Sequence, residues 1–399
     1  MRAAPGAGVG PRVGLWAGLW AGLWTGLCMG VLALSACGPA DRPAVEVAGS
    51  GLAVLAQGAA GFAQARPGAA LEFPRDHGAH PAFRIEWWYL TANLEDAAGR
   101  PYGAQWTLFR FAAQPPAAPP SDAPQTEIGW HSEQVFMAHF ALTTPTDHVA
   151  FQRYARGGDH GGVRQAGASG EPFAAWLDDW RLASTGPAWL PLEVQARQGD
   201  QALRLRLDSD RPLVLQGQGG FSRKHPAGGG SYYYSQPFLE ARGELVVDGE
   251  SLSVTGQAWL DREWSSQFLQ PDQTGWDWFA LHLDSGEKLM LFRLRQRSGD
   301  AHYEHGVLIA PDGSTRALDP SRLAFHVLAE SAVAGRRLPL HWRIDLPEIG
   351  RSLTLEALHS DQWLDLDYPY WEGAVTVTGD GPGSRGRGYL ELTGYPRDR

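Results

Sequence analysis

Residues 88–111 read WYLTANLEDAAGRPYGAQWTLFRF, and residues 278–294 read WFALHLDSGEKLMLFRL. Each stretch begins with an aromatic pair, passes through an acidic turn that contains a glycine, and closes on Leu-Phe-Arg followed by an apolar residue. Two copies of one meander predict two related structural units. We expect the boundary between the units near residues 265–274, and we expect Trp88 and Trp278 at equivalent positions.

The local patterns around the repeat are almost all those of β-strands. Residues 203–207 (LRLRL) alternate apolar and charged side chains, and Asp248-Gly249 is a hairpin-turn signal after an apolar strand. A second repeat relates residues 239–261 to residues 370–395; each segment contains a strand, a glycine turn and a closing strand. The sequence therefore predicts an all-β protein of two fused antiparallel β-barrels, because closure of a sheet removes exposed edges. Barrels of about eight strands leave room for side chains or one small ligand.

The composition excludes several classes of protein. The 399-residue chain has a net charge of −10, so it lacks the basic character that phosphate binding needs, and we expect no nucleic-acid partner. Its two cysteines, Cys28 and Cys37, both lie in an N-terminal apolar tract. The folded part therefore contains no disulfide, no thiol nucleophile and no thiolate metal ligand. Tryptophan is frequent, at 17 residues, and suits a cavity wall that is apolar with one polar group.

The N-terminus has the pattern of an export signal. Arginines precede an apolar stretch from Val13 that ends in Leu34-Ser35-Ala36-Cys37, which predicts a signal peptide over residues 1–36. The final four residues resemble a bacterial lipobox, so Cys37 is the predicted lipidation site and membrane anchor. The alternative is an uncleaved membrane helix, since about 20 apolar residues can span a bilayer. We expect a tether over residues 37–70 and a location in the cell envelope, on the periplasmic side; Gly38 favours the outer membrane.

Three segments combine aromatic and acidic residues, namely residues 86–89 (EWWY), 259–264 (WLDREW) and 276–279 (WDWF). Side chains of this kind suit the wall of a site for an apolar ligand. Trp88 and Trp278 are expected to plug the closed ends of the barrels. The candidate ligand-binding residues are Trp87, Tyr89, His139, Tyr233, Trp259, Trp264 and Trp276.

Asp261 is the candidate catalytic residue. It lies between two tryptophans at the end of an alternating strand, where partial desolvation would raise the pKa of its carboxyl group and let it donate a proton. The alternative is a structural ion pair with the neighbouring Arg262, which would lower that pKa.

We predict neither a metal nor a cofactor. His77 and His80 beside Asp76 have ligand-like spacing, but no third histidine completes a local motif. The glycine-rich segments lack the lysine and the strand-to-helix setting of a phosphate-binding loop. The chain also lacks a Gly-x-Ser-x-Gly nucleophile elbow, which argues against an α/β-type serine hydrolase.

Seven segments, in order between about residues 71 and 396, resemble the AttH branch of the AttH/CrtC family, whose members are labelled predicted secreted hydrolases or carotenoid 1,2-hydratase-like proteins. They are Phe73-Pro74-Arg75-Asp76-His77-Gly78, Glu86-Trp87-Trp88-Tyr89, Met137-Ala138-His139-Phe140, Ser231-Tyr232-Tyr233-Tyr234, Trp259-Leu260-Asp261-Arg262-Glu263-Trp264-Ser265, Gly275-Trp276-Asp277-Trp278-Phe279 and Tyr370-Trp371-Glu372-Gly373. The resemblance implies two lipocalin-like domains, which we place at residues 71–266 and 267–399.

The resemblance also implies a chemistry. The hydratase branch adds water to the terminal double bond of acyclic carotenoids without a cofactor, and its proposed acid is an aspartate in a motif like aromatic-x-Asp-His-Asn. Asp261 matches that aspartate, whereas Arg262-Glu263 replaces His-Asn and argues against carotenoid hydration itself. The AttH branch is associated with components of export-type transporters, so an ABC-type export system is an implied partner.

Two functional hypotheses follow. In the first, the protein is an envelope lipoprotein that binds or carries an apolar, lipid- or isoprenoid-like ligand. In the second, it is a cofactor-independent hydro-lyase or hydrolase of the carotenoid 1,2-hydratase type, with Asp261 as general acid. Aromatic walls suit both, because π faces stabilise a carbocation as well as contact a lipid tail. The sequence favours binding, because Arg262 beside Asp261 would depress the pKa that acid catalysis needs raised.

Overall fold

The computed structural model describes residues 59–116, 132–158, 164–298, 302–381 and 383–398. Over these residues the chain consists of antiparallel strands and three short 3-10 helices, Arg75–His77, Pro320–Arg322 and Pro347–Ile349. This confirms the all-β prediction. None of the helices in this part of the chain has the length and hydropathy needed to cross a membrane. The predicted signal peptide and Cys37 lie outside the described residues.

The first sheet is built from strands β1 to β13 and runs in the order β4-β3-β2-β1-β13-β12-β9-β8-β7-β6-β5, with β10 and β11 paired to β12. Its strands are β1 (Ile85–Asp96), β2 (Pro101–Ala112), β3 (Gln134–Thr143), β4 (His148–Arg156), β5 (Ala166–Gly170), β6 (Phe173–Leu177), β7 (Trp180–Ser184), β8 (Leu192–Gln198), β9 (Gln201–Asp208), β10 (Val214–Leu215), β11 (Phe221–Arg223), β12 (Gly230–Val247) and β13 (Glu250–Ser265).

The second sheet runs in the order β17-β16-β15-β14-β23-β22-β20-β19-β18, with β21 paired to β22. Its strands are β14 (Gln273–Leu283), β15 (Lys288–Gln296), β16 (His302–Ile309), β17 (Thr315–Leu318), β18 (Ala324–Val333), β19 (Arg336–Leu346), β20 (Arg351–Ala357), β21 (Trp363–Leu364), β22 (Tyr370–Gly379) and β23 (Gly386–Leu392). The chain therefore passes from the first sheet to the second between Ser265 and Gln273.

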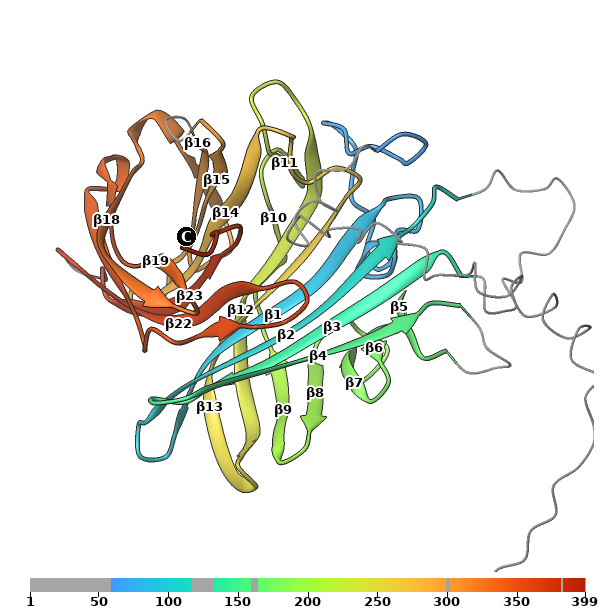
Figure 1. Ribbon diagram of the computed structural model, residues 1–399, viewed down its shortest axis with the longest axis horizontal. Coiled ribbons are helices and arrows are strands. Elements are labelled where there is room, and N and C mark those ends of the chain that lie inside the picture. The colour runs from blue at the N-terminus through green and yellow to red at the C-terminus, as the bar shows by residue number, and fades with distance from the viewer. Residues whose placement is uncertain (1–58, 117–131, 159–163, 299–301, 382, 399) are drawn as a thin grey trace, which may run out of the picture. The chain divides into compact units, whose positions relative to one another are not determined.

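The two sheets repeat one plan, in agreement with two fused lipocalin-like barrels. Strand β1 lies between β2 and β13, as β14 lies between β15 and β23 (Figure 1). The hairpin turns after β1 and β14 each place a glycine, Gly99 and Gly286, at positive φ. The predicted Asp248-Gly249 turn between β12 and β13 has positive φ at both residues, as a type I′ hairpin requires.

The strand register corrects one predicted equivalence. Trp87 lies opposite Phe109 of the first Leu-Phe-Arg segment, and Trp278 lies opposite Phe292 of the second. The counterpart of Trp278 is therefore Trp87, and the pairing of Trp88 with Trp278 was wrong by one residue. Because side chains alternate along a strand, that one residue exchanges the two faces. Trp88 is buried inside the first sheet, whereas Trp278 lies in the layer between the sheets.

Each sheet curls around its own apolar core. In the first, Phe140 of β3 meets Trp180 of β7 edge-on at 5.7 Å between ring centres. In the second, Phe279 of β14 meets Trp342 of β19 in the same way at 5.6 Å. A third buried cluster draws side chains from both sheets and joins them. The interiors are thus filled by side chains, and the layer between the sheets is where a ligand site must be sought.

The described part of the predicted tether, residues 59–70, packs against the first sheet. The backbone N–H of Ala63 donates to the carbonyl of Ala82 at 2.9 Å, and that of Arg66 donates to the Tyr232 hydroxyl at 3.1 Å. These bonds fix the approach of the chain to β1.

Candidate functional site

A cavity lies between the facing strands of the two sheets. Its volume, measured as the space open to the centre of a water molecule, is about 60 Å³. As it stands the cavity holds a few waters or a small ring, so a bulkier ligand requires the aromatic walls to move. Its lining residues are Ile85, Trp87, Tyr89, Phe109, Phe111, Met137, Lys224, Tyr233, Asp261, Glu263, Phe268, Trp276, Trp278, Phe292, Leu294, Tyr368 and Glu391.

Asp261 lies in this cavity on β13 and is held by three donors. The Tyr233 hydroxyl donates to Oδ2 at 2.7 Å, and Trp259 Nε1 donates to Oδ1 at 2.7 Å. The Ser235 hydroxyl also donates to Oδ1. Tyr233 and Ser235 come from β12, which pairs with β13 so that Ser235 lies opposite Asp261. The carboxyl group is thus fixed in orientation by the sheet that carries it.

Burial raises the pKa of Asp261 to about 7, although the hydrogen bonds from Ser235, Tyr233 and Trp259 oppose this shift. The Coulomb repulsion of Glu263 adds to the increase. Desolvation disfavours the charged form of any carboxyl group, and an apolar wall offers no compensating charge. Near neutral pH the group therefore carries a transferable proton for a substantial part of the time.

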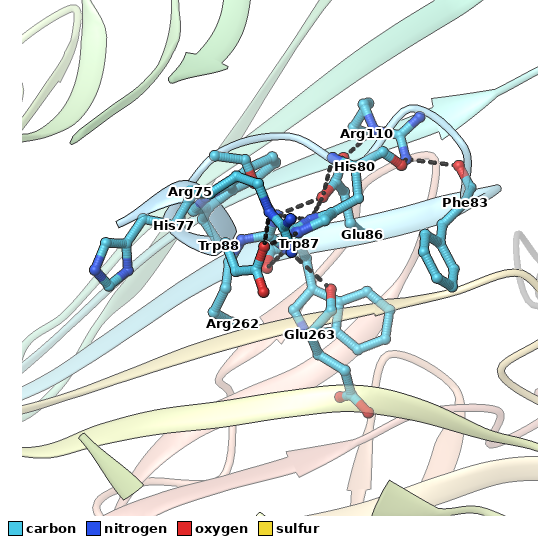
Figure 2. Close-up of polar contacts among 12 residues, drawn as sticks. Arg75, His77, His80, Phe83, Glu86, Trp87, Trp88, Arg110, Arg262 and Glu263 are labelled. Atoms are coloured by element: carbon cyan, nitrogen blue, oxygen red, sulfur yellow. Dashed lines mark hydrogen bonds and ion pairs between the residues drawn. The ribbon is translucent and has the colours of Figure 1, made fainter. Parts of the chain in front are cut away.

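Arg262 lies on the opposite face of β13 and does not contact Asp261. Figure 2 shows Glu86 beside Arg110 and Arg262, with the Glu263 side chain pointing away from this cluster. The Arg262 guanidinium also lies 3.9 Å from the Trp88 ring centre. Burial opposes the ionisation of Glu86, but Arg110 and Arg262 hold its pKa well below the usual range. The alternative left open by the sequence, an ion pair of Arg262 with Asp261, does not form, because successive strand residues point to opposite faces; Arg262 pairs with Glu86 instead.

Glu263, two residues after Asp261, returns to the cavity face. Its Oε1 accepts the Ser231 hydroxyl and forms an ion pair with Lys224 Nζ at 2.7 Å. The Lys224 ammonium also lies 4.6 Å from the ring centre of Phe292. The Lys224 ammonium thus lies in the cavity wall, where it is paired with the Glu263 carboxylate and not with Asp261.

The second sheet contributes two further carboxyl groups, Glu372 and Glu391, from register neighbours on β22 and β23. The Tyr89 hydroxyl donates to Glu372 Oε1. Burial raises the pKa of both carboxyl groups, and repulsion by Asp261 and Glu263 raises that of Glu391 further. Like charges held this close favour retention of a proton within the pair. The cavity thus has proton-carrying groups on both of its sides.

The structure brings most of the predicted site residues together. Of the candidates, Trp87, Tyr89, Tyr233, Asp261 and Trp276 line the cavity, and Trp259 contacts it through its bond to Asp261.

Two of the predicted ligand-binding residues lie elsewhere. Trp264 shares the face of Arg262 and stacks on His80 at 4.0 Å, so it does not line the cavity; alternation along β13 separates it from Asp261. His139 lies behind Phe109, with Nδ1 2.9 Å from the Tyr370 hydroxyl, and does not line the cavity.

Sequence reasoning missed Lys224, Glu263 and Glu391. Alternation from Asp261 identifies Glu263 as a residue of the same face, so that signal was present in the sequence. Lys224 precedes β12 in a loop, and Glu391 lies 130 positions after Asp261, so no local pattern joins either of them to the site.

The site has no arrangement suited to a metal ion. Among the described residues no three His, Cys, Asp or Glu side chains converge as ligands. His77 is instead stacked on Trp189 at 3.7 Å, with Nδ1 2.7 Å from the Tyr234 hydroxyl.

Comparison with known proteins gives a family and several structural relatives. The family model described as AttH-like matches residues 64–395. A putative AttH from Nitrosomonas europaea is 38% identical, with a TM-score of 0.72 over 84% of this chain and 100% of that one. Kievitone hydratase from Nectria haematococca (15% identity, TM-score 0.57, 84% and 98% covered) and CghA crystallised with Sch210972 (14%, 0.53, 86% and 99%) share the fold. No curated protein matches the chain.

Proposed function

This chain belongs to the AttH-like family, and from that premise we propose that it is a cofactor-independent hydratase. In this proposal it adds water across a carbon–carbon double bond of an apolar substrate held in the cavity between the sheets. The observation that carries the proposal is the Asp261 carboxyl group, which is buried in an aromatic wall and has its pKa raised to about 7. A positioned acid of that pKa is matched to proton transfer near neutral pH.

The reaction needs one proton donor and one proton acceptor. The π electrons of the alkene take the proton of Asp261, which forms a C–H bond on one carbon and leaves a cation on the other. A water molecule attacks that cation, and its surplus proton returns to the Asp261 carboxylate directly or through Glu391. Trp278 and Tyr89 present rings to the cavity, and electron-rich ring faces stabilise a nearby cation. No external oxidant, reductant or cofactor is required.

Two considerations support hydration over other acid-catalysed reactions. The fold is shared with kievitone hydratase, so it is compatible with hydration in at least that protein. The cavity is also large enough for a few waters, so once the aromatic walls move apart to admit an alkene, a water can reach the cation as the nucleophile. The small free space and the Arg262-Glu263 pair after Asp261 favour a substrate smaller than a carotenoid.

The alternative use of the same cavity is binding or carriage of an apolar ligand without turnover. The observation in its favour is the lining itself, which is mostly aromatic. Under this alternative the lipid anchor predicted at Cys37 would hold a ligand-binding protein on the periplasmic side of the envelope, and an export system remains its proposed partner.

The test is Asp261→Asn, which keeps the shape of the side chain and removes the transferable proton. Purified protein is incubated with a panel of apolar alkenes, isoprenoid and aryl-substituted, in water labelled with heavy oxygen, and labelled alcohols are measured by mass spectrometry. We expect the wild type to form an alcohol and the variant to lose at least about 100-fold in rate while binding the substrate unchanged. Asp345→Asn, on β19 and outside the cavity, is the matched control and should retain the wild-type rate.

Two outcomes would contradict the proposal. Equal rates in the wild type and Asp261→Asn would remove Asp261 from the chemistry. Tight binding of an alkene with no labelled product from any member of the panel would favour the carrier alternative.

A further inference from the structure

A second hollow, here called the lysine groove, lies at another part of the junction between the sheets. It is open to solvent, has a volume of about 630 Å³, and shares no lining residue with the Asp261 cavity. Its walls come from the end of β9, the middle of β12 and the β14–β15 hairpin. The lining residues used below are Lys288, Phe238, Glu240, Arg242 and Asp208.

Lys288 is the unusual residue of this groove. Its side chain is only 3% exposed, yet it forms no ion pair and no hydrogen bond with the described residues. Its single specific contact there is with the Phe238 ring, whose centre lies 5.4 Å from Nζ. A buried ammonium without a carboxylate is costly, and such a lysine resolves the cost by losing its proton or by binding a ligand.

None of the described residues around Lys288 forms an ion pair or a hydrogen bond with its ammonium group. His282 lies opposite it in the β14–β15 register, and burial together with the charges of Lys288 and Arg387 holds the pKa of that imidazole well below its usual range. Its Nδ1 has no hydrogen-bond partner among the described residues. Glu240 and Arg242 also face the groove, but neither is paired with Lys288. Burial lowers the pKa of Lys288 to about 8.

We propose that Lys288 is a reactive amine that captures carbonyl compounds, aldehydes or unhindered ketones, as imines in the lysine groove. The geometry supports this because the lysine is largely buried, is ion-paired with none of the described residues and opens onto a space large enough for a small molecule. Desolvation in an apolar contact is one of the ways proteins activate a lysine as a nucleophile.

The step balances without a co-reactant. The lone pair of Nζ forms a C–N bond to the carbonyl carbon, and the carbonyl oxygen takes a proton from the nitrogen to give a carbinolamine. The nitrogen lone pair then expels the hydroxyl group, which takes a proton from solvent and leaves as water. The resulting iminium returns one proton to solvent to give the imine. The product is a C=N bond to Lys288, and hydrolysis reverses it.

The chain provides its own control, since Lys224 and Lys288 are its two lysines. Both are buried, at 3% exposure each. Lys224 differs because its Nζ is ion-paired with Glu263 at 2.7 Å, so that nitrogen is held against a carboxylate. A reagent that attacks an unpaired amine therefore distinguishes the two lysines within one molecule.

The experiment treats the folded full chain with propanal and cyanoborohydride at pH 7–9 and maps the N-alkylated lysines by peptide mass spectrometry. We expect Lys288 to be alkylated at least about ten times faster than Lys224, with a rate that rises towards a plateau above pH 8. Lys288→Arg should abolish the fast modification, and Lys224→Arg should leave it. In denaturant the two lysines should react at similar rates.

Two results would overturn the proposal: equal or slower modification of Lys288 in the folded protein, or modification of Lys288 only after unfolding, which would make it a buried structural residue. Asp261→Asn should be alkylated at Lys288 as the wild type is, because the two sites share no residue. The outcome is therefore independent of whether the protein is a hydratase.

Discussion

Replacement of Asp261 by asparagine should stabilise this protein at alkaline pH. The pKa of Asp261 is raised from its ordinary 3.8 to about 7, so the folded state binds a proton that the unfolded state has released throughout the interval between those values. The unfolding free energy of the wild type must therefore fall as pH rises through that interval. Each tenfold change in an acid constant is worth about 1.4 kcal/mol, so the loss is on the order of 4 kcal/mol, and it is complete above pH 7.

Asparagine resembles the protonated acid and does not titrate. Its amide oxygen can accept the bonds that Trp259 and Ser235 now donate, and its amide nitrogen can donate to the Tyr233 oxygen. The variant should thus match the wild type near pH 4 and exceed it by a few kcal/mol at pH 8.

The assay is urea unfolding followed by tryptophan fluorescence, performed on both proteins at several pH values between 4 and 8. The quantity compared is the difference in unfolding free energy between variant and wild type, because titrations common to both proteins cancel in it. A difference that does not grow with pH, or a variant less stable than the wild type at pH 8, would show that burial does not hold the Asp261 proton. The acid role proposed above would fall with that result.

Glu86→Gln should lower the unfolding free energy by about 3–5 kcal/mol, because it leaves Arg110 and Arg262 buried without a carboxylate. Denaturant unfolding measures this, and a loss under about 1 kcal/mol would contradict a central role for that cluster. Cys37→Ser should release the protein from membranes or leave an unprocessed precursor, as fractionation and intact mass would show. Unchanged membrane association and an unchanged mass would refute the lipid anchor.

Local sequence patterns were sufficient to predict a strand and its buried face where the other face of that strand meets solvent. Strand β9 alternates from Leu203 to Leu207 between buried leucines and more accessible arginines, with Arg204 exposed and Arg206 half-buried, as the sequence LRLRL predicts. The turn Asp248-Gly249 was predictable because few residue pairs other than Asn-Gly and Asp-Gly favour positive φ twice in succession. The repeated meander likewise predicted two sheets of one plan, since similar segments bury similar faces.

Hydropathy patterns failed to assign the faces of the strands that carry the site. In β1 and β14 almost every residue is buried, because one face packs into a sheet's own core and the other into the layer between the sheets. Alternation in hydropathy then disappears, and nothing local tells which face is which. This is why Trp88 was matched to Trp278. The end of β13, from Ala258 to Ser265, is buried on both faces in the same way, which is why Trp264 was expected at the ligand site.

The sequence by itself determined that this protein is a duplicated all-β chain with an aspartate set between tryptophans on a strand. The tertiary structure alone decided that the cavity lies between the two sheets, that Arg262 turns away from Asp261 to Glu86, and that Glu391 faces Asp261 from the other sheet. The physical reason is that the pKa of a carboxyl group depends on what surrounds it in space. Those surroundings combine neighbours on β12 and β13 with side chains from strands more than a hundred residues away, whose contacts form only when the two sheets pack together.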